Sequence, residues 1–530
     1  MYIVVLTWEV GVSMQKSGLD NAGNEFLIGT FQKGTQRFNR FAYVYSDKYF
    51  ENSANRYNAS LATMSLCLTI STYPYKTFDN GAVCYENQSK NVNLLLRELG
   101  FKDIRVNSDF RKKPTLQTIG VATGHKKIDV FGKAYTLIPI VIRSVGYEAE
   151  WGNNMQAGPR GNHNGFNRAA NIVKKFVDEY INKMNNVEGS VKFWIVGWSR
   201  GGAVAGLVGK LYNDYCDICE RKQGFSNYNK NISINKGDIY VYTFASPKGF
   251  HITNNRHSRK YFNIRNVIND NDYVTKIPVK CWGFSRPGVD HRLLKGGKEA
   301  DICRMKRILS KMCFKVFGDV NIDYKADRFR TYGFSLFSED ISTQSQFLDC
   351  FLEMIANCFF IGQSEKFKKR FGNNIHGLRM AYFRCEKTIS RLIELCVGDE
   401  DFSKSMSKMF NKRYSKLNLF FKIIFSKSKF IESVRKICDD IFVDYNRKQS
   451  KIDPSRKVSS KEIKSLKDGI CDMLIYFNKM ANYRYWYIFF KNVSNILSVH
   501  EPEICLACLI DEDPKKDIYL NQMRNIIYNF

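Results

Sequence analysis

Hydrophobic and polar positions follow two different periods along the first three hundred residues of the chain. Apolar, β-branched runs bounded by turn residues predict strands at 119–130, 134–142, 191–197, 238–244 and 261–269. Apolar residues spaced three and four apart predict helices at 56–71, 91–99 and 166–184, and one that begins just after residue 199. Strands that alternate with helices predict an α/β fold class, with a mostly parallel sheet covered on both faces.

The pattern changes near residue 298, where long, basic, helix-like segments replace the strands. Apolar helical segments are predicted at 347–361, 417–425 and 468–490, and a polar, lysine-rich connector at 447–467. We therefore expect four parts: an N-terminal segment without clear periodicity, an α/β core, a helical basic insertion that forms a cap or lid, and a C-terminal return to the core. Their predicted bounds are 1–40, 41–295, 296–495 and 496–530.

The composition is that of a globular protein with an unusual charge. Hydrophobic residues make up 44% of the 530 positions, and the formal net charge is +29. Such a charge implies affinity for nucleic acid or acidic lipid headgroups, or serves solubility alone. Signature nucleic-acid motifs are absent from the sequence, so nucleic acid is the less favoured partner and peripheral contact with an anionic membrane the more favoured one.

Localisation is indicated by the cysteines and by the apolar runs. Fifteen cysteines scattered through a long chain suit reduced thiols, and the two Cys-x-x-Cys pairs, Cys216 with Cys219 and Cys505 with Cys508, are interpreted as helix thiols rather than metal ligands. We expect no spanning helix and no secretory leader. These features favour a cytoplasmic protein, with non-classical secretion left open.

One short stretch carries the candidate chemistry. Gly197-Trp-Ser-Arg-Gly201 lies between a predicted strand and a predicted helix and matches Gly-x-Ser-x-Gly, the sharp turn that exposes a nucleophilic hydroxyl. Backbone N–H groups at the start of the helix would favour negative charge beside Ser199. The alternative is an ordinary glycine-containing turn of an α/β domain.

A nucleophilic serine requires a base and a carboxylate, and the residues alone leave both open. Asp270 and Asp272 both follow the strand predicted at 261–269, so either could be the acid. Three histidines lie downstream and could be the base, namely His291, His376 and His500.

Five blocks, taken in order, resemble the class 3 (fungal-lipase-type) family of α/β-hydrolases, and more closely its uncharacterised bacterial branch. They are Val141-Ile-Arg-Ser-Val-Gly-Tyr-Glu-Ala-Glu-Trp151, His163-Asn-Gly-Phe166, Gly197-Trp-Ser-Arg-Gly-Gly-Ala203, Phe244-Ala-Ser-Pro247 and Asn269-Asp-Asn-Asp-Tyr-Val-Thr-Lys-Ile-Pro278. A closing block, Ser498-Val-His-Glu-Pro-Glu503, is also similar. The resemblance covers about residues 40 to 295 and a short piece near 500.

The resemblance implies an α/β-hydrolase core and a role for each matching residue. Ser199 matches the nucleophile, Asp272 the acid and His500 the base, with His376 as an alternative base. The N–H groups of Ser144 and Arg200 would form the oxyanion hole, although Arg143-Ser-Val-Gly146 departs from the family pattern at this point. His291 is then expected to pack on a late strand, and His163 to have a structural role.

The sequence therefore predicts a serine hydrolase that cleaves carboxylic esters, with lipids as the favoured substrates and no metal or organic cofactor. Lipase, phospholipase, thioesterase and protease activities remain open, since function belongs to the site rather than the fold. The alternative is an inactive hydrolase-like protein that binds anionic partners through its basic insertion. The oligomeric state is not indicated.

Overall fold

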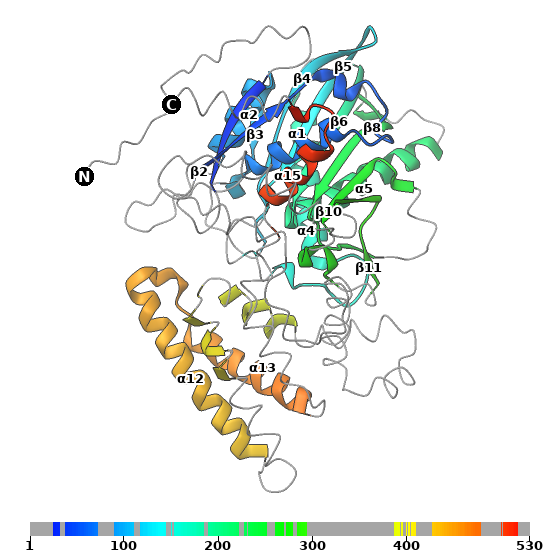
Figure 1. Ribbon diagram of the computed structural model, residues 1–530. Coiled ribbons are helices and arrows are strands. Elements are labelled where there is room, and N and C mark those ends of the chain that lie inside the picture. The colour runs from blue at the N-terminus through cyan, green and yellow to red at the C-terminus, as the bar shows by residue number, and fades with distance from the viewer. Residues whose placement is uncertain are drawn as a thin grey trace, which may run out of the picture.

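A computed structural model of the chain shows a central β-sheet between two layers of helices (Figure 1). Beside it lies a helical region, whose described residues are most of 386–409 and all of 427–478. The residues that the structure describes are 25–31, 38–72, 89–110, 117–144, 150, 153–184, 189–221, 227–229, 232–251, 260–269, 272–278, 283–293, most of 386–409, 427–478, 500 and 502–517.

The main sheet has eight strands, and five of its neighbouring strands are parallel. Along the sheet the order is β12-β10-β8-β6-β5-β4-β3, with β7 paired to β8. Strands β5, β6, β8, β10 and β12 are parallel, while β4 is antiparallel to both β5 and β3. The predicted α/β fold with a mostly parallel sheet is confirmed.

The described strands are β1 (Glu25–Phe31), β2 (Phe38–Val44), β3 (Lys102–Val106), β4 (Val121–Val130), β5 (Lys133–Ile142), β6 (Gly189–Trp198), β7 (Asn227–Asn229), β8 (Ile232–Phe244), β9 (Phe250–His251), β10 (Ile264–Asn269), β11 (Phe284–Ser285) and β12 (Val289–Leu293). The described α-helices are α1 (Ala59–Ile70), α2 (Lys90–Glu98), α4 (Asn164–Asn182), α5 (Arg200–Arg221), α12 (Lys427–Ile452), α13 (Ser460–Asn478) and α15 (Pro502–Glu512). Short 3-10 turns are η1 (Asp47–Phe50), η2 (Ser108–Phe110), η4 (Tyr273–Lys276) and η7 (Pro454–Arg456).

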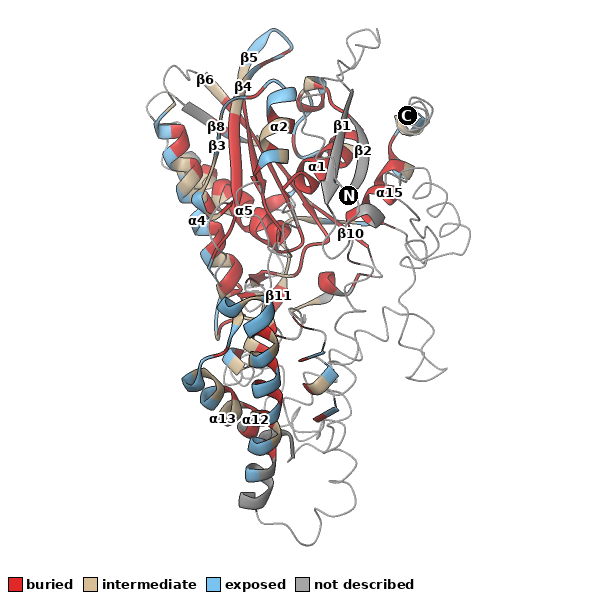
Figure 2. Ribbon diagram, turned by 90° about the vertical axis from the view of Figure 1, so that its left-hand side faces the viewer, coloured by how far each residue is buried: buried red, intermediate tan, exposed pale blue. Residues whose placement is uncertain are grey.

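Helices from distant parts of the chain cover the two faces of the sheet (Figure 2). Helices α4 and α5 pack on one face, in an apolar core that includes Ile195 of β6 and Val241 of β8. Helices α1, α2 and α15 pack on the other, against Trp194 and Val196 of β6. Alternate residues of β6 thus enter opposite cores, and both sets are fully buried, which explains why the strand reads as one continuous apolar run.

Capping residues explain where the predicted helices of the core begin and end. Asn58 caps α1 by accepting a hydrogen bond from the N–H of Leu61 at 3.0 Å, two residues after the start predicted from the apolar pattern. Gly100 follows α2 with a φ of +85°, the left-handed conformation that commonly ends a helix. Strands β1, β2 and β3 were not predicted.

The connector predicted at 447–467 is wrong in its extent. Helix α12 continues to Ile452, and α13 begins at Ser460, so only a short turn around Pro454 separates two helices. Lysine and serine kept this stretch polar, but buried residues such as Gln449 and Val458 hold it against neighbouring structure. The helices predicted at 347–361 and 417–425 lie outside the described residues.

The helical region contacts the core at a defined point. Glu386, which is buried, accepts a hydrogen bond from the backbone N–H of Gly158 at 3.0 Å. Helices α12 and α13 pack on each other and are joined by an ion pair between Arg435 and Asp468 at 2.6 Å. Among the described helices, none is both long enough and apolar enough to cross a membrane. The domain bounds given above remain predictions.

Candidate active site

Ser199 lies at the turn between the central strand and the helix that follows it. Strand β6 ends at Trp198 and α5 begins at Arg200, so the change of direction falls on Ser199, which has a φ of +52°. A residue with a side chain rarely adopts this conformation, and such strain is concentrated at functional sites. The N–H of Ser199 donates to the carbonyl of Phe244 at 2.8 Å, which holds the turn against the end of β8.

Two glycines make this turn possible because backbone passes too close for any side chain. A Cβ on Gly197 would lie 2.1 Å from the carbonyl oxygen of Gly201. A Cβ on Gly201 would lie 2.6 Å from the carbonyl oxygen of Ile142 and 2.8 Å from that of Arg143. The first turn of α5 is therefore packed directly on the end of β5.

A histidine and an aspartate complete a hydrogen-bonded chain with this serine. The Nε2 atom of His500 lies 2.6 Å from Ser199 Oγ, and its Nδ1 atom lies 2.7 Å from Asp272 Oδ2. All three residues are buried, with 6%, 9% and 1% of Ser199, His500 and Asp272 exposed. With a proton on Nδ1, His500 donates to Asp272 and accepts from the serine hydroxyl.

Asp272 is held in place by the segment that follows β10. The N–H of Asp272 donates to the carbonyl of Asn269 at 3.0 Å, and its Oδ1 atom accepts from the N–H of Val274 at 2.9 Å, which caps η4. Its second carboxylate oxygen is therefore directed to the imidazole. Strand β10 lies two places from β6 in the parallel sheet, so the carboxyl ends of both strands reach the same edge.

The position of His500 is set by the packing of α15. His500 comes two residues before this helix, which packs on α1 through buried residues that include Leu506 and Leu509. The indole of Trp198 lies against the imidazole, with ring centroids 5.2 Å apart. The ring of His500 is thus held by an apolar contact as well as by its two hydrogen bonds.

The other candidate residues do not join this chain or are not described. His291 lies on β12, where its ring stacks on Tyr57 and its Nε2 atom lies 2.7 Å from Glu512. His163 caps α4 by accepting from the N–H of Phe166 at 3.4 Å. Asp270 and His376 lie outside the described residues.

Two N–H groups proposed for the oxyanion hole lie on adjoining segments. Arg200 is the first residue of α5, so its N–H has no acceptor within the helix. Ser144 follows β5, and the peptide group that bears its N–H begins at the carbonyl of Arg143, which is the group that approaches Gly201. Both residues are buried.

Sequence inspection missed the side chains behind this turn. Glu150 accepts a hydrogen bond from Arg143 at 2.5 Å, and the same oxygen lies 3.7 Å from the guanidinium of Arg200. The sequence signal that could have found them is Arg200, which stands in an otherwise apolar strand–turn–helix segment. A charge buried there requires a counter-charge.

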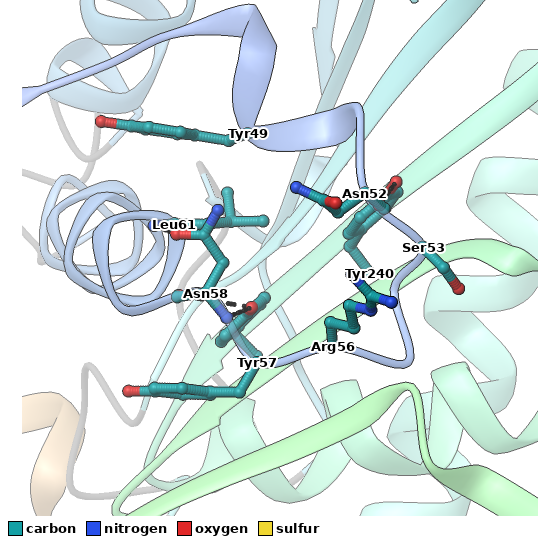
Figure 3. A pocket seen from close by; sticks show the side chains of 9 residues that line it. Tyr49, Asn52, Ser53, Arg56, Tyr57, Asn58, Leu61 and Tyr240 are labelled. Atoms are coloured by element: carbon teal, nitrogen blue, oxygen red, sulfur yellow. Dashed lines mark hydrogen bonds between the residues drawn. The ribbon is translucent and has the colours of Figure 1, made fainter.

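The described pocket and the described cysteines are not part of the hydrogen-bonded chain of Ser199, His500 and Asp272. In the part of the chain that the structure describes, no three His, Cys, Asp or Glu residues form a group that could hold a metal ion. Cys216 and Cys219 on α5, and Cys505 and Cys508 on α15, are thiols that form no disulfide. A pocket of about 170 Å³ lies between the loop before α1 and strand β8 (Figure 3). It is lined by Tyr49, Asn52, Ser53, Arg56, Tyr57, Asn58, Leu61, Tyr240 and Tyr242, and so lacks Ser199, Asp272 and His500.

Comparison with known proteins identifies the core. The model of the family described as Lipase (class 3) matches residues 147–282, a segment that contains Ser199 and Asp272 but not His500. This match confirms the resemblance to class 3 lipase-type α/β-hydrolases over the matched segment. No curated protein matches the chain.

Solved structures of lipases are similar to part of the chain at low identity. Lipase II from Rhizopus niveus is 16% identical, with 43% of this chain and 80% of that chain covered and a TM-score of 0.25. The lipase from Rhizopus microsporus var. chinensis is 18% identical, with 43% and 74% covered and a TM-score of 0.24. A triacylglycerol lipase whose catalytic centre is described as a serine protease triad is 15% identical, with 44% and 77% covered and a TM-score of 0.26.

Proposed function

We propose that this chain, whose residues 147–282 match the class 3 lipase family, is a serine hydrolase that cleaves carboxylic esters. One observation carries the proposal: Ser199, His500 and Asp272 form a hydrogen-bonded chain with distances of 2.6 and 2.7 Å. A nucleophile, a base and an orienting carboxylate in this order are what acyl transfer requires.

In the proposed mechanism His500 accepts the proton of Ser199 as the hydroxyl oxygen attacks the ester carbonyl carbon. Asp272 stabilises the imidazolium that forms, and the N–H groups of Arg200 and Ser144 donate to the oxyanion of the tetrahedral intermediate. His500 then protonates the leaving alcohol, which leaves an acyl group on Ser199. Water, deprotonated by His500, attacks this acyl-enzyme and releases the acid.

Hydrolysis of a short p-nitrophenyl ester tests the proposal. Ser199→Ala and His500→Ala are each expected to lower kcat by at least about 10⁴-fold, because the members of such a triad act as a unit. His125→Gln is the matched control, since His125 lies on β4 and contacts Tyr180 rather than the turn at Ser199. Turnover by Ser199→Ala at the wild-type rate would show that the turn at Ser199 is not the active site.

Chemical labelling of the serine distinguishes an active hydrolase from an inactive hydrolase-like protein. A fluorophosphonate probe reacts with a serine only when a neighbouring base activates it. Labelling of wild type that is lost in Ser199→Ala supports the hydrolase. Failure of wild type to label would favour the alternative, a hydrolase-like protein that binds anionic partners through its basic helical region.

For the substrate class we propose lipid esters, with the helical region acting as a cap that contacts an anionic membrane surface. Support comes from the hairpin of α12 and α13, where Ile452 is 63% exposed at the end of α12. Exposed lysines lie beside it in the chain, in the turn that follows and at the start of α13, namely Lys451, Lys457, Lys461 and Lys464. An exposed apolar side chain among lysines suits the interface of an acidic bilayer.

Liposome flotation tests this contact. Wild type is expected to float with vesicles that contain phosphatidylserine and to stay in solution with neutral ones, and Ile452→Asp combined with Lys451→Gln is expected to weaken flotation. Val443→Asp is the matched control, because Val443 is 62% exposed on the same helix but lies two turns before the basic end. Equal flotation with neutral and acidic vesicles would contradict electrostatic attachment.

A further inference from the structure

A fully buried cluster of charged side chains lies directly behind the proposed oxyanion hole. Arg143, Glu150 and Arg200 are each 0% exposed. Oε1 of Glu150 accepts from Nη2 of Arg143 at 2.5 Å and from the hydroxyl of Thr118 at 3.0 Å. Nη1 of Arg200 lies 3.7 Å from this same Oε1 atom and donates to the carbonyl of Thr118 at 2.8 Å.

Burial of this charged cluster lowers the stability of the fold. Two guanidinium groups share one buried carboxylate, and transferring such charges from water costs several kcal/mol for each ion. Burial lowers the pKa of Arg200 from its ordinary value, with Glu150 acting in the opposite direction. Among the described residues, none accepts a hydrogen bond from Nε or Nη2 of Arg200. An apolar side chain would fill this position at lower cost, so stability alone does not account for the arginine.

The position of the cluster in the chain indicates its purpose. Arg200 itself bears one of the proposed oxyanion donors, and Arg143 directly precedes Ser144, which bears the other. The two residues extend from different segments, the start of α5 and the end of β5, to the same carboxylate oxygen of Glu150, and Arg200 also donates to the carbonyl of Thr118. The cluster therefore ties together the two pieces of backbone whose separation sets the width of the hole.

We propose that Arg200 is a positioning residue that, through Glu150 and Thr118, holds its own N–H and that of Ser144 at the separation an oxyanion requires. This inference rests on the proposed hydrolase function. An oxyanion hole stabilises the transition state rather than the bound ester, so a wider hole lowers kcat and leaves KM almost unchanged.

Arg200→Met is the main test, because methionine fills a similar volume and retains the backbone N–H. Glu150 keeps Arg143 as its counter-charge in this variant, so we expect a folded protein with a Tm close to wild type. We expect kcat to fall by about 10- to 100-fold with KM within about twofold, since small misplacements of catalytic groups have effects of this size. The rate of fluorophosphonate labelling should fall in parallel, because the phosphoryl oxygen occupies the same hole.

A matched control lies on β6, the strand that leads to Ser199 and Arg200, but far from its carboxyl end. Lys192 on β6 forms a buried ion pair with Asp238 on β8, and both residues precede the carboxyl ends of their strands by six positions. Lys192→Met also replaces a buried cation by methionine, and it should lower Tm without lowering kcat. A fall in kcat as large as that of Arg200→Met would show that the effect is general loosening of the sheet, and would overturn the inference.

Glu150→Gln separates positioning from simple electrostatic attraction. If Arg200 acted only as a nearby positive charge, removing the carboxylate would strengthen its field and raise kcat. Positioning predicts the opposite, a fall in kcat at unchanged KM, because the arginines lose their shared partner. An unchanged or increased kcat overturns the inference.

The two proposals fail in different ways. Wild type that neither hydrolyses esters nor labels with the probe would refute the hydrolase itself. Active wild type accompanied by an equally active Arg200→Met would refute the positioning role alone.

Discussion

A single added carbon at Gly201 should damage this site more than it damages the fold. In Gly201→Ala the new Cβ would lie 2.6 Å from the carbonyl oxygen of Ile142 and 2.8 Å from that of Arg143. An ordinary contact at this position begins near 3.4 Å, so α5 and the end of β5 must separate by about 0.8 Å. Neither partner is the flexible end of a side chain, because both are backbone carbonyls.

The displaced groups are those that we assign to the oxyanion hole. Arg200 is the neighbour of Gly201, and the carbonyl of Arg143 belongs to the peptide that bears the N–H of Ser144. We therefore expect kcat for a p-nitrophenyl ester to fall by about 10- to 100-fold, the effect of misplacing catalytic groups by less than about 1 Å. Overpacking should also lower the free energy of unfolding by about 1 to 3 kcal/mol.

Gly206→Ala on the same helix provides the control. Its Cβ would meet Cγ of Pro287 at 3.4 Å, which is an ordinary contact, so the helix need not move. Alanine in a helix should raise the free energy of unfolding by up to about 1 kcal/mol with kcat unchanged. Urea unfolding and steady-state kinetics on both variants give the comparison. A Gly201→Ala enzyme with wild-type kcat would refute the assignment of this backbone junction to the oxyanion hole.

Three further predictions follow from other contacts. Asp272→Asn should lower kcat by about 10⁴-fold, because an amide facing Nδ1 favours the wrong tautomer of His500, while the side-chain oxygen of residue 272 still caps η4. Steady-state kinetics and a Tm measurement check this prediction, and a wild-type kcat would contradict it. Burial raises the pKa of the Cys67 and Cys505 thiols, so peptide-resolved alkylation at pH 8 should leave both unmodified in the folded protein and modify both after denaturation; rapid native labelling would contradict their burial. Burial lowers the pKa of His125, so the unfolded chain binds more protons than the native state below about pH 6.5, and stability should fall as the pH is lowered from 7 towards 5. His125→Gln should reduce the slope of Tm against pH in that window, and an unchanged slope would exclude this contribution.

Much of the core could be predicted from the sequence because its signals are local. The apolar run of β6, the glycines around Ser199 and the amphipathic pattern of α4 each specify backbone within a few residues. The same rules failed where context decides, as in the stretch around residue 450, whose polar composition suggested a connector although α12 runs through it. Intrinsic preference is a weak guide when packing against a partner helix stabilises a segment.

The sequence by itself determined the sharp turn at Ser199, the α/β class and a short set of candidate acids and bases, since each depends on neighbouring residues. The family resemblance implied His500, but only the tertiary structure showed that this histidine meets Ser199: it lies 301 residues further along the chain, and α15 brings it to the turn by packing on α1. It likewise revealed Glu150 as the counter-charge of Arg200. Spacing along a chain carries no information about such meetings, because they are fixed by which apolar faces pack together and by which buried charges must be paired.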